Sequence, residues 1–213
     1  MNTDDLISLL AKDAKALPSP SPTRRFALTL VPSLAVCTAL VLTLWGINPG
    51  LFSLADVPAF WFKMGWLVAL SACAWALMQR LSVPAKRARG PANGLALTVA
   101  VLLVLGALQW SIADESLRPQ LVRGISWRTC TLSIAALSMP VLGVLLWTLK
   151  GLAPTRPGAA GAAAGLMAGA LAALAYSLHC PELAFTFLAL WYGAAISAMT
   201  ALGALIGRRV LRW

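Results

Sequence analysis

Six apolar runs, each long enough to form a membrane-crossing helix, limit what this chain can fold into. They cover residues 26–46, 58–78, 92–112, 128–149, 157–178 and 183–206. A helix of about 20 residues spans the hydrocarbon core of a bilayer, which is ~30 Å thick. The runs lack the alternation of polar and apolar residues that the strands of a membrane barrel require. The sequence therefore predicts an all-α integral membrane protein with a bundle of six transmembrane helices.

Charged residues are scarce and lie mostly between these runs. Only 11% of the 213 residues are charged, against about 25% in soluble proteins. We expect two parts: residues 1–25 form a cytoplasmic tail with a proline-rich tether, and residues 26–213 form the transmembrane domain. The tail does not resemble a signal peptide, because it opens with Asp4 and Asp5 instead of basic residues.

The net charge of +10 is distributed unevenly between the two sides of the predicted bundle. If both termini are cytoplasmic, four of the 17 Lys and Arg residues lie outside, namely Lys63, Arg118, Arg123 and Arg128, and the rest lie inside. This bias follows the positive-inside rule and predicts a multi-pass protein with cytoplasmic N- and C-termini. Because anionic lipid headgroups are the natural counter-ions of such charges, we expect contact with the bilayer and no direct contact with nucleic acid.

The pattern of the tail predicts a short cytoplasmic helix over residues 3–17, followed by the prolines of the tether. A helix of this length is marginal in water, so its narrow apolar stripe is expected to order on another surface. That surface is either the bilayer or a groove on a partner protein, and the acidic start of the helix favours the protein. The candidate partner-binding residues are Asp4, Asp5, Leu6, Ile7, Leu9 and Leu10.

Two of the four cysteines fall on the same, non-cytoplasmic side of the predicted bundle. Cys130 starts the fourth span, and Cys180 lies in the turn before the sixth, whereas Cys37 and Cys73 lie inside apolar runs as packing residues. Thiols outside the cytosol can be oxidised, so a disulfide is chemically permitted. The pair is interpreted either as a responsive sensor or as a static disulfide that staples the spans together.

The same turn also offers donors for a metal ion. Cys130, His179, Cys180 and Glu182 would supply sulfur, nitrogen, sulfur and oxygen ligands, a set suited to soft or borderline metals. A protonated His179 would also favour the thiolate of its neighbour. We expect that no cofactor is required and that heavy-metal binding at the cysteine pair is transient. A plainer alternative is that Pro181 and Glu182 merely start a helix.

Two further expectations concern the surroundings of Lys63 and the packing of the glycine-rich fifth span. Lys63 enters the second span near its outer end, where it is expected to reach the interface or to pair with an outer acid such as Asp56. Gly161, Gly165 and Gly169, repeated at every fourth position, allow close approach of another helix. We expect this approach within the bundle, with a homodimer contact as the alternative.

Several segments of the chain together resemble one family of bacterial regulators. They are the opening Asn2-Thr3-Asp4-Asp5-Leu6-Ile7-Ser8-Leu9-Leu10, the segment Pro58-Ala59-Phe60-Trp61-Phe62-Lys63, the turn His179-Cys180-Pro181-Glu182 followed by Leu190-Trp191-Tyr192, and the closing Gly207-Arg208-Arg209. These segments are similar to those of the NrsF-type membrane anti-sigma factors, which are negative regulators of extracytoplasmic-function (ECF) sigma factors. The resemblance covers nearly the whole chain, and the His-Cys-Pro-Glu turn is its most specific part.

The resemblance implies a location and a mode of action. It implies six spans in the bacterial inner membrane and an N-terminal cytosolic segment that holds an ECF sigma factor. It also implies two periplasmic cysteines that matter for release of the sigma factor, and these correspond to Cys130 and Cys180. Metal binding or oxidation at this pair would then shift the last three spans and release the partner of the tail.

Two other function classes find less support in the sequence. A small transporter or permease subunit needs polar residues at the middle of the membrane, and the six runs hold almost none. A membrane enzyme needs a nucleophile with a base, and His179 is the only histidine. We therefore expect that the protein is not an enzyme.

Overall fold

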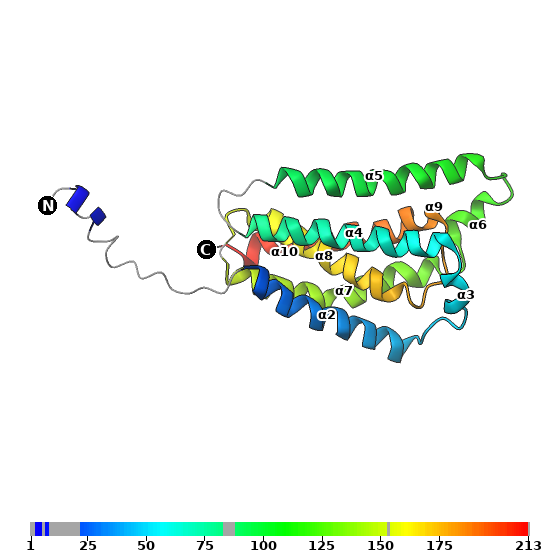
Figure 1. Ribbon diagram of the computed structural model, residues 1–213, viewed down its shortest axis with the longest axis horizontal. Coiled ribbons are helices and arrows are strands. Elements are labelled where there is room, and N and C mark those ends of the chain that lie inside the picture. The colour runs from blue at the N-terminus through cyan, green and yellow to red at the C-terminus, as the bar shows by residue number, and fades with distance from the viewer. Residues whose placement is uncertain (1–2, 6, 9–21, 83–87, 153, 213) are drawn as a thin grey trace.

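The computed structural model describes residues 3–5, 7–8, 22–82, 88–152 and 154–212, and every regular element in these ranges is helical (Figure 1). The long helices are α2 (Pro22–Leu44), α4 (Pro58–Leu81), α5 (Arg89–Ile112), α7 (Trp127–Lys150), α8 (Pro157–Tyr176) and α10 (Gly193–Val210). Short elements join them: α3 (Leu51–Ala55), α6 (Arg118–Arg123), α9 (Phe185–Phe187) and the π-helical η1 (Leu188–Tyr192). Within the described ranges, six helical segments are long and apolar enough to cross a membrane, which confirms the six predicted runs.

Prolines set several of the helix starts. Pro58 and Pro157 occupy the first turns of α4 and α8, where the missing proline N–H has no helical partner to lose. Two other prolines, Pro32 in α2 and Pro140 in α7, lie inside long helices. Most of the predicted 3–17 helix falls outside the described residues.

The bundle has two distinct ends. Helix α2 begins and α10 ends on the left of Figure 1, and we refer to this as the terminal end. Cys130, in the first turn of α7, and Cys180, after α8, lie at the opposite end, which we refer to as the thiol end. The start of α2 and the end of α10 therefore lie at the same end of the bundle, as an even number of spans requires.

Helix α8 is the centre of the bundle because its side chains are small. Most of its residues are buried, and it packs against α10, α4, α7 and α2. A methyl group on Gly161 would collide with the backbone oxygen of Gly203 in α10, and one on Gly165 would collide with that of Met199. The predicted close approach within the bundle is confirmed, and α10 is the helix that makes it.

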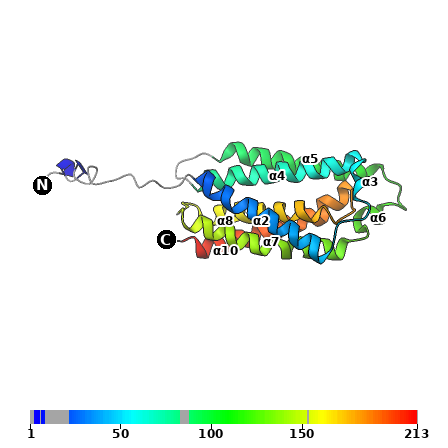
Figure 2. The same cartoon turned by 60° about the horizontal axis from the view of Figure 1, so that its bottom comes forward.

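The outer face of the bundle is apolar. Leu28, Val31, Leu97, Leu132 and Trp147 are among many large hydrophobic side chains that the structure leaves exposed. A surface of this kind is unfavourable in water and suits contact with lipid. Helix α5 is the least buried of the six candidate spans and lies beside α4 at the edge of the bundle in both views (Figures 1 and 2).

Candidate functional site: a buried thiol pair at the thiol end

The turn that carries Cys180 begins where α8 unwinds. The backbone N–H groups of His179 and Cys180 both donate to the carbonyl of Tyr176, at 3.0 Å each. Pro181 follows and has no N–H with which to continue the helix. The chain then runs extended through Glu182 to α9. We refer to residues 177–184 as the outer turn.

Cys130 lies in the first turn of α7, directly against the outer turn. Its N–H donates to the carbonyl of Ser126 at 2.9 Å, which starts the helix. The hydroxyl of the same serine lies 3.6 Å from Sγ of Cys180. Cys130 is fully buried and Cys180 is 2% exposed, and both are free thiols. The structure therefore brings together the two cysteines that the sequence singled out.

The two thiols are chemically unequal. The thiol of Cys130 donates a hydrogen bond to Cys180, and the ammonium group of Lys63 adds a positive charge nearby. Both interactions favour the ionised form of Cys180, and they lower its pKa below the usual range of a thiol despite the burial that opposes ionisation. Because the thiolate is the more reactive form of a cysteine, this environment favours Cys180 over Cys130 as a nucleophile.

Lys63 is part of this site, and the expectation that it reaches the interface or pairs with an outer acid is wrong. Its side chain is fully buried, and its ammonium group donates to the backbone carbonyls of Cys180 and Glu182, at 3.1 Å each. The same group lies 5.0 Å from the centre of the Tyr192 ring. A buried ammonium needs such partners, because an unpaired charge in an apolar interior is very unfavourable. Lys63 thus ties α4 to the outer turn.

Glu182 ties the loop before α7 to the outer turn. Its carboxylate accepts a hydrogen bond of 2.5 Å from the backbone N–H of Ile125. The preceding residue, Gly124, has a φ of +50°, and a Cβ there would lie 2.5 Å from a carboxylate oxygen of Glu182. Only glycine satisfies both the backbone angle and the space.

His179 turns away from the thiols toward the loop after α2. Its Nδ1 lies 3.2 Å from the carbonyl of Gly46, and its ring packs on Tyr176 with centroids 5.7 Å apart. The backbone N–H of Asn48 in the same loop donates to the carbonyl of Leu178 at 3.2 Å. The outer turn is therefore held from three sides: by the loop after α2, by α4, and by the segment before α7.

The four candidate metal ligands do not gather into one cluster. Cys130 and Cys180 lie together, whereas His179 faces Gly46 and Glu182 faces Ile125. In the part of the chain that the structure describes, no group of three or more His, Cys, Asp or Glu side chains is placed to hold a metal ion. Two sulfur ligands are what this arrangement offers to a soft metal.

The candidate partner-binding residues of the tail lie far from the thiols along the chain. Asp4, Asp5 and Ile7 are exposed, and the hydroxyl of Ser8 donates to the carbonyl of Asp5 at 2.9 Å. Leu6, Leu9 and Leu10 lie outside the described residues. The exposed positions leave these acids and Ile7 free to meet a partner.

Sequence reasoning assigned no role at the thiols to Lys63, Ser126 or Tyr192. One signal was available, because a lysine inside an apolar run is a functional candidate by default. The partners of Lys63 are backbone carbonyls in a turn over a hundred residues away in sequence. Every residue has such a carbonyl, so the residue types of the turn do not reveal the contact.

Together, fold and site define a helical protein with six candidate membrane spans and a buried pair of free thiols at one end of the bundle. Comparison with known proteins then supplies the family. Residues 10–213 match the family described as NrsF, negative regulator of sigma F, and the chain belongs to this family.

Two similar proteins match along their whole length. The probable anti-sigma-F factor NrsF of Azospira oryzae is 39% identical over 213 residues, with 100% of both chains covered. The anti-sigma-F factor NrsF of Caulobacter vibrioides is 40% identical over 216 residues, again with 100% of both chains covered. No solved structure matches the chain.

Proposed function

We propose that this protein is an anti-sigma factor of the bacterial inner membrane with both termini in the cytoplasm. Its N-terminal segment, with Asp4, Asp5, Leu6, Ile7, Leu9 and Leu10, sequesters an ECF sigma factor. Reaction of Cys130 and Cys180 with an oxidant or a soft metal ion on the periplasmic side releases that partner. Full-length similarity to anti-sigma-F factors supports the regulatory role. The observation that carries the sensing role is the buried thiol pair beneath the outer turn.

The chemistry follows from the unequal thiols. With a hydroperoxide, the thiolate of Cys180 attacks an oxygen and forms a sulfenic acid while an alcohol leaves. The thiol of Cys130 then displaces water from this sulfur and forms the disulfide, so the pair has given up two electrons and two protons. A soft divalent ion would instead replace both protons and bind the two thiolates. Either reaction fixes the start of α7 to the outer turn by a new bond.

The new bond can move the bundle because the outer turn leads into its most tightly packed pair of helices. A disulfide requires Cβ atoms about 3.5–4.5 Å apart, a tighter constraint than two neighbouring thiols impose. The outer turn joins α8 to the segment before α10, and these two helices are in close backbone contact at Gly161 and Gly203. The reaction releases the sigma factor only if the reacted state binds it more weakly, since a ligand shifts an equilibrium through differential affinity alone.

The sensing role is tested by capture of the sigma factor with the full-length protein in membranes. Captured sigma factor should fall at least about tenfold after treatment with a hydroperoxide or Cd²⁺, which corresponds to a coupling of about 1.4 kcal/mol. The double substitution Cys130→Ser/Cys180→Ser should keep its partner under both treatments. Cys37→Ser/Cys73→Ser is the matched control and should respond as the unaltered protein does. An unchanged response in the first variant would show that the thiols are not the sensor.

The role of the tail is tested separately. Removal of residues 1–17 should abolish capture and free the sigma factor in cells. Asp4→Asn/Asp5→Asn should weaken capture more at low salt than at high salt, because screening already removes most of the attraction between exposed charges at high salt. If the truncated chain still repressed the sigma factor, the proposal for the tail would be wrong, and the proposal for the thiols would not be affected.

A further inference from the structure

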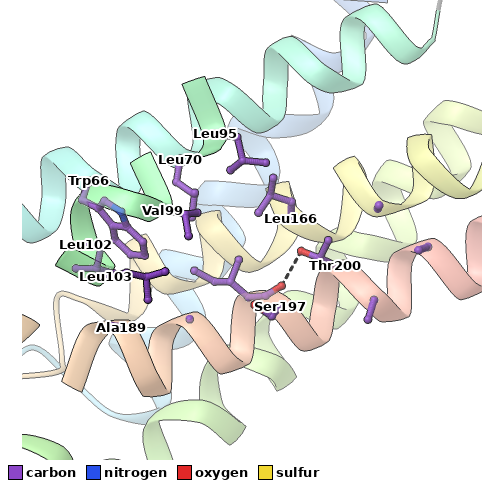
Figure 3. Close-up of a pocket in the computed structure, with 15 residues that line it drawn as sticks. Trp66, Leu70, Leu95, Val99, Leu102, Leu103, Leu166, Ala189, Ser197 and Thr200 are labelled. Atoms are coloured by element: carbon purple, nitrogen blue, oxygen red, sulfur yellow. Dashed lines mark hydrogen bonds between the residues drawn. The ribbon is translucent and has the colours of Figure 1, made fainter. Parts of the chain in front are cut away.

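A second site lies away from the thiols, in a groove on the side of the bundle. A hollow of about 390 Å³ is lined by side chains of α4, α5, α8 and α10 (Figure 3). Its walls include Trp66, Leu102, Leu166, Ile196, Ala201 and Ala204. The volume falls within the range of sites that bind small molecules, about 300–1,000 Å³. We refer to this hollow as the lateral groove.

The lateral groove exists because α5 packs along α4 and leaves α10 uncovered on this side. Helix α5 packs mainly on α4 and on α9, rather than on α8 or α10. Small residues on the facing helices, Ala162 in α8 and Ala201 and Ala204 in α10, leave the space open. The groove is thus built into the packing of the bundle.

The lining of the lateral groove selects an apolar occupant. The indole N–H of Trp66 donates to the carbonyl of Thr98 at 3.0 Å. The hydroxyl of Thr200 donates to the carbonyl of Ile196 at 2.8 Å (Figure 3). These polar groups are therefore already satisfied within the protein. An empty apolar hollow forfeits dispersion contacts along its walls. Within a bilayer, hydrocarbon chains are the material at hand to fill it.

Arg208 lies next to the groove, toward the terminal end of the bundle. Arg208 follows Ala204 by one turn on the same face of α10. Helix α8 gives an independent check: Gly158 precedes Ala162 by one turn, and a Cβ on Gly158 would lie 3.0 Å from Cγ and Nε of Arg208. Both helices therefore place the Arg208 side chain directly beyond the groove.

This end of α10 is strongly basic. Arg208, Arg209 and Arg212 together line a second hollow of about 520 Å³. Arg208 forms no ion pair with the carboxylates that the structure describes. A guanidinium group binds a phosphate through two parallel hydrogen bonds, so this cluster is complementary to the headgroup of an anionic lipid.

We propose that the lateral groove binds one acyl chain of an anionic phospholipid from the leaflet at the terminal end, with the phosphate held by Arg208 and its neighbours. The proposal rests on the membrane location given under Proposed function and on no part of the sigma-factor chemistry. The bound lipid fills the space between α5 and the α8–α10 pair and joins them. Two features together favour this occupant: the apolar lining of the groove and the guanidinium group of Arg208 one turn beyond it, with Arg209 and Arg212 close by along α10.

The test uses the full-length protein in detergent, titrated with phosphatidylglycerol or with phosphatidylcholine of identical acyl chains, and bound lipid is counted by native mass spectrometry. Phosphatidylglycerol should bind at least about fivefold more tightly, as expected when one basic side chain near the surface contributes. Arg208→Gln should remove most of this preference. The matched control Arg89→Gln removes an exposed charge at the same end of the bundle and should keep it.

A second pair of variants tests the groove itself. Ala201→Trp places an indole in the lateral groove, whereas Ala198→Trp places one on an exposed position of α10 outside it. The first should lose the tightly bound lipid and the second should keep it, while both retain the helical circular dichroism spectrum. Ala201→Phe serves if the larger side chain prevents folding.

Three outcomes would overturn the proposal. Equal affinity for the two lipids would show that the headgroup is not recognised. Lipid that stays bound in both Ala201→Trp and Ala201→Phe would show that the groove is not the binding site. New lipid binding that appears only after deletion of residues 1–17 would show that the tail is the occupant. Capture of the sigma factor, measured on the same samples, separates these failures from a failure of the proposed function.

Discussion

Replacement of Lys63 by methionine isolates what a buried cation does for the thiol pair. Methionine keeps the approximate length and apolar stem of the side chain but removes the ammonium group. Two hydrogen bonds of 3.1 Å to the carbonyls of Cys180 and Glu182 are lost. So is the contact with the Tyr192 ring, 5.0 Å away. The change touches no sulfur atom directly.

The stability effects of Lys63→Met oppose one another. Leaving two carbonyls without partners destabilises the fold by about 1–3 kcal/mol each, and loss of a desolvated cation–π contact adds about 2 kcal/mol. Removing a buried charge recovers a desolvation penalty of several kcal/mol. We therefore expect a small change in the free energy of unfolding and a large local effect on the outer turn.

The clearest readout is the reactivity of Cys180. A neighbouring positive charge lowers a thiol pKa by about 1–3 units, and Lys63 contributes in this sense here. Loss of the charge should therefore move the midpoint of the rate of alkylation against pH upward by at least about one unit. At a pH below both midpoints the alkylation rate should fall by about threefold for each unit by which the midpoint rises, because the thiolate fraction falls about tenfold while the more basic thiolate is about threefold more nucleophilic.

The lowered pKa of Cys180 also makes the stability of the fold depend on pH. A thiol whose pKa is lower in the folded state stabilises that state fully above its unfolded pKa, about 8.5, and loses this contribution as the pH falls through the folded value. Lys63→Met should therefore flatten the rise of stability with pH below about 8.5. The slope is obtained from denaturant unfolding at several pH values.

The assay is alkylation by iodoacetamide in a chain where Cys37, Cys73 and Cys130 are replaced by serine. Lys150→Met is the matched control, because it removes an exposed lysine at the other end of the bundle. Lys63→Arg retains the charge and should restore most of the low midpoint. An identical midpoint for the Lys63→Met and unaltered chains would refute the electrostatic reasoning, and so would an equal shift from the control.

Three further substitutions test the packing around the site. Gly124 has a φ of +50° and lies against a carboxylate, so Gly124→Ala should lower the free energy of unfolding by about 1–3 kcal/mol. Gly65 has open space around it, so the control Gly65→Ala should change that free energy by less than about 0.5 kcal/mol. Thermal unfolding measures both variants. Gly161→Ala should separate α8 from α10 and destabilise by about 1–3 kcal/mol or more, unlike Gly143→Ala, which meets nothing; equal yields of folded protein would contradict this. Glu182→Gln should cost about 1–2 kcal/mol by weakening the bond to the Ile125 N–H, seen as faster hydrogen exchange there.

The six candidate membrane spans could be predicted because their signal is local. A run of apolar residues of sufficient length fixes a span, and Pro58 and Pro157 mark helix starts. The described helices differ from the predicted runs mainly at their ends, as in α5, which begins at Arg89 and not at residue 92. Helices α3 and α6 were missed because five or six residues carry too little periodic pattern.

The thiol site could be predicted only in part. The asymmetry of basic residues placed Cys130 and Cys180 on one side, and the structure brings them together. The partners of His179 and Glu182 could not be foreseen, since a backbone carbonyl and a backbone N–H hold them. For the same reason Lys63 was expected at the surface: snorkelling is the favourable choice when no buried acceptor is known.

The π-helical segment η1 gives the bundle a discrete way to turn. It lies between the outer turn and α10, so residues 188–192 are the covalent route from Cys180 to α10. A π turn holds one more residue than an α turn, and its conversion would rotate the following helix by about 100° and advance it by about 1.5 Å. Gly203 and Gly207 lock the angular setting of α10 against α8. Motion of α10 about its own axis would therefore come in whole-residue steps, which suits an on–off response better than a graded one.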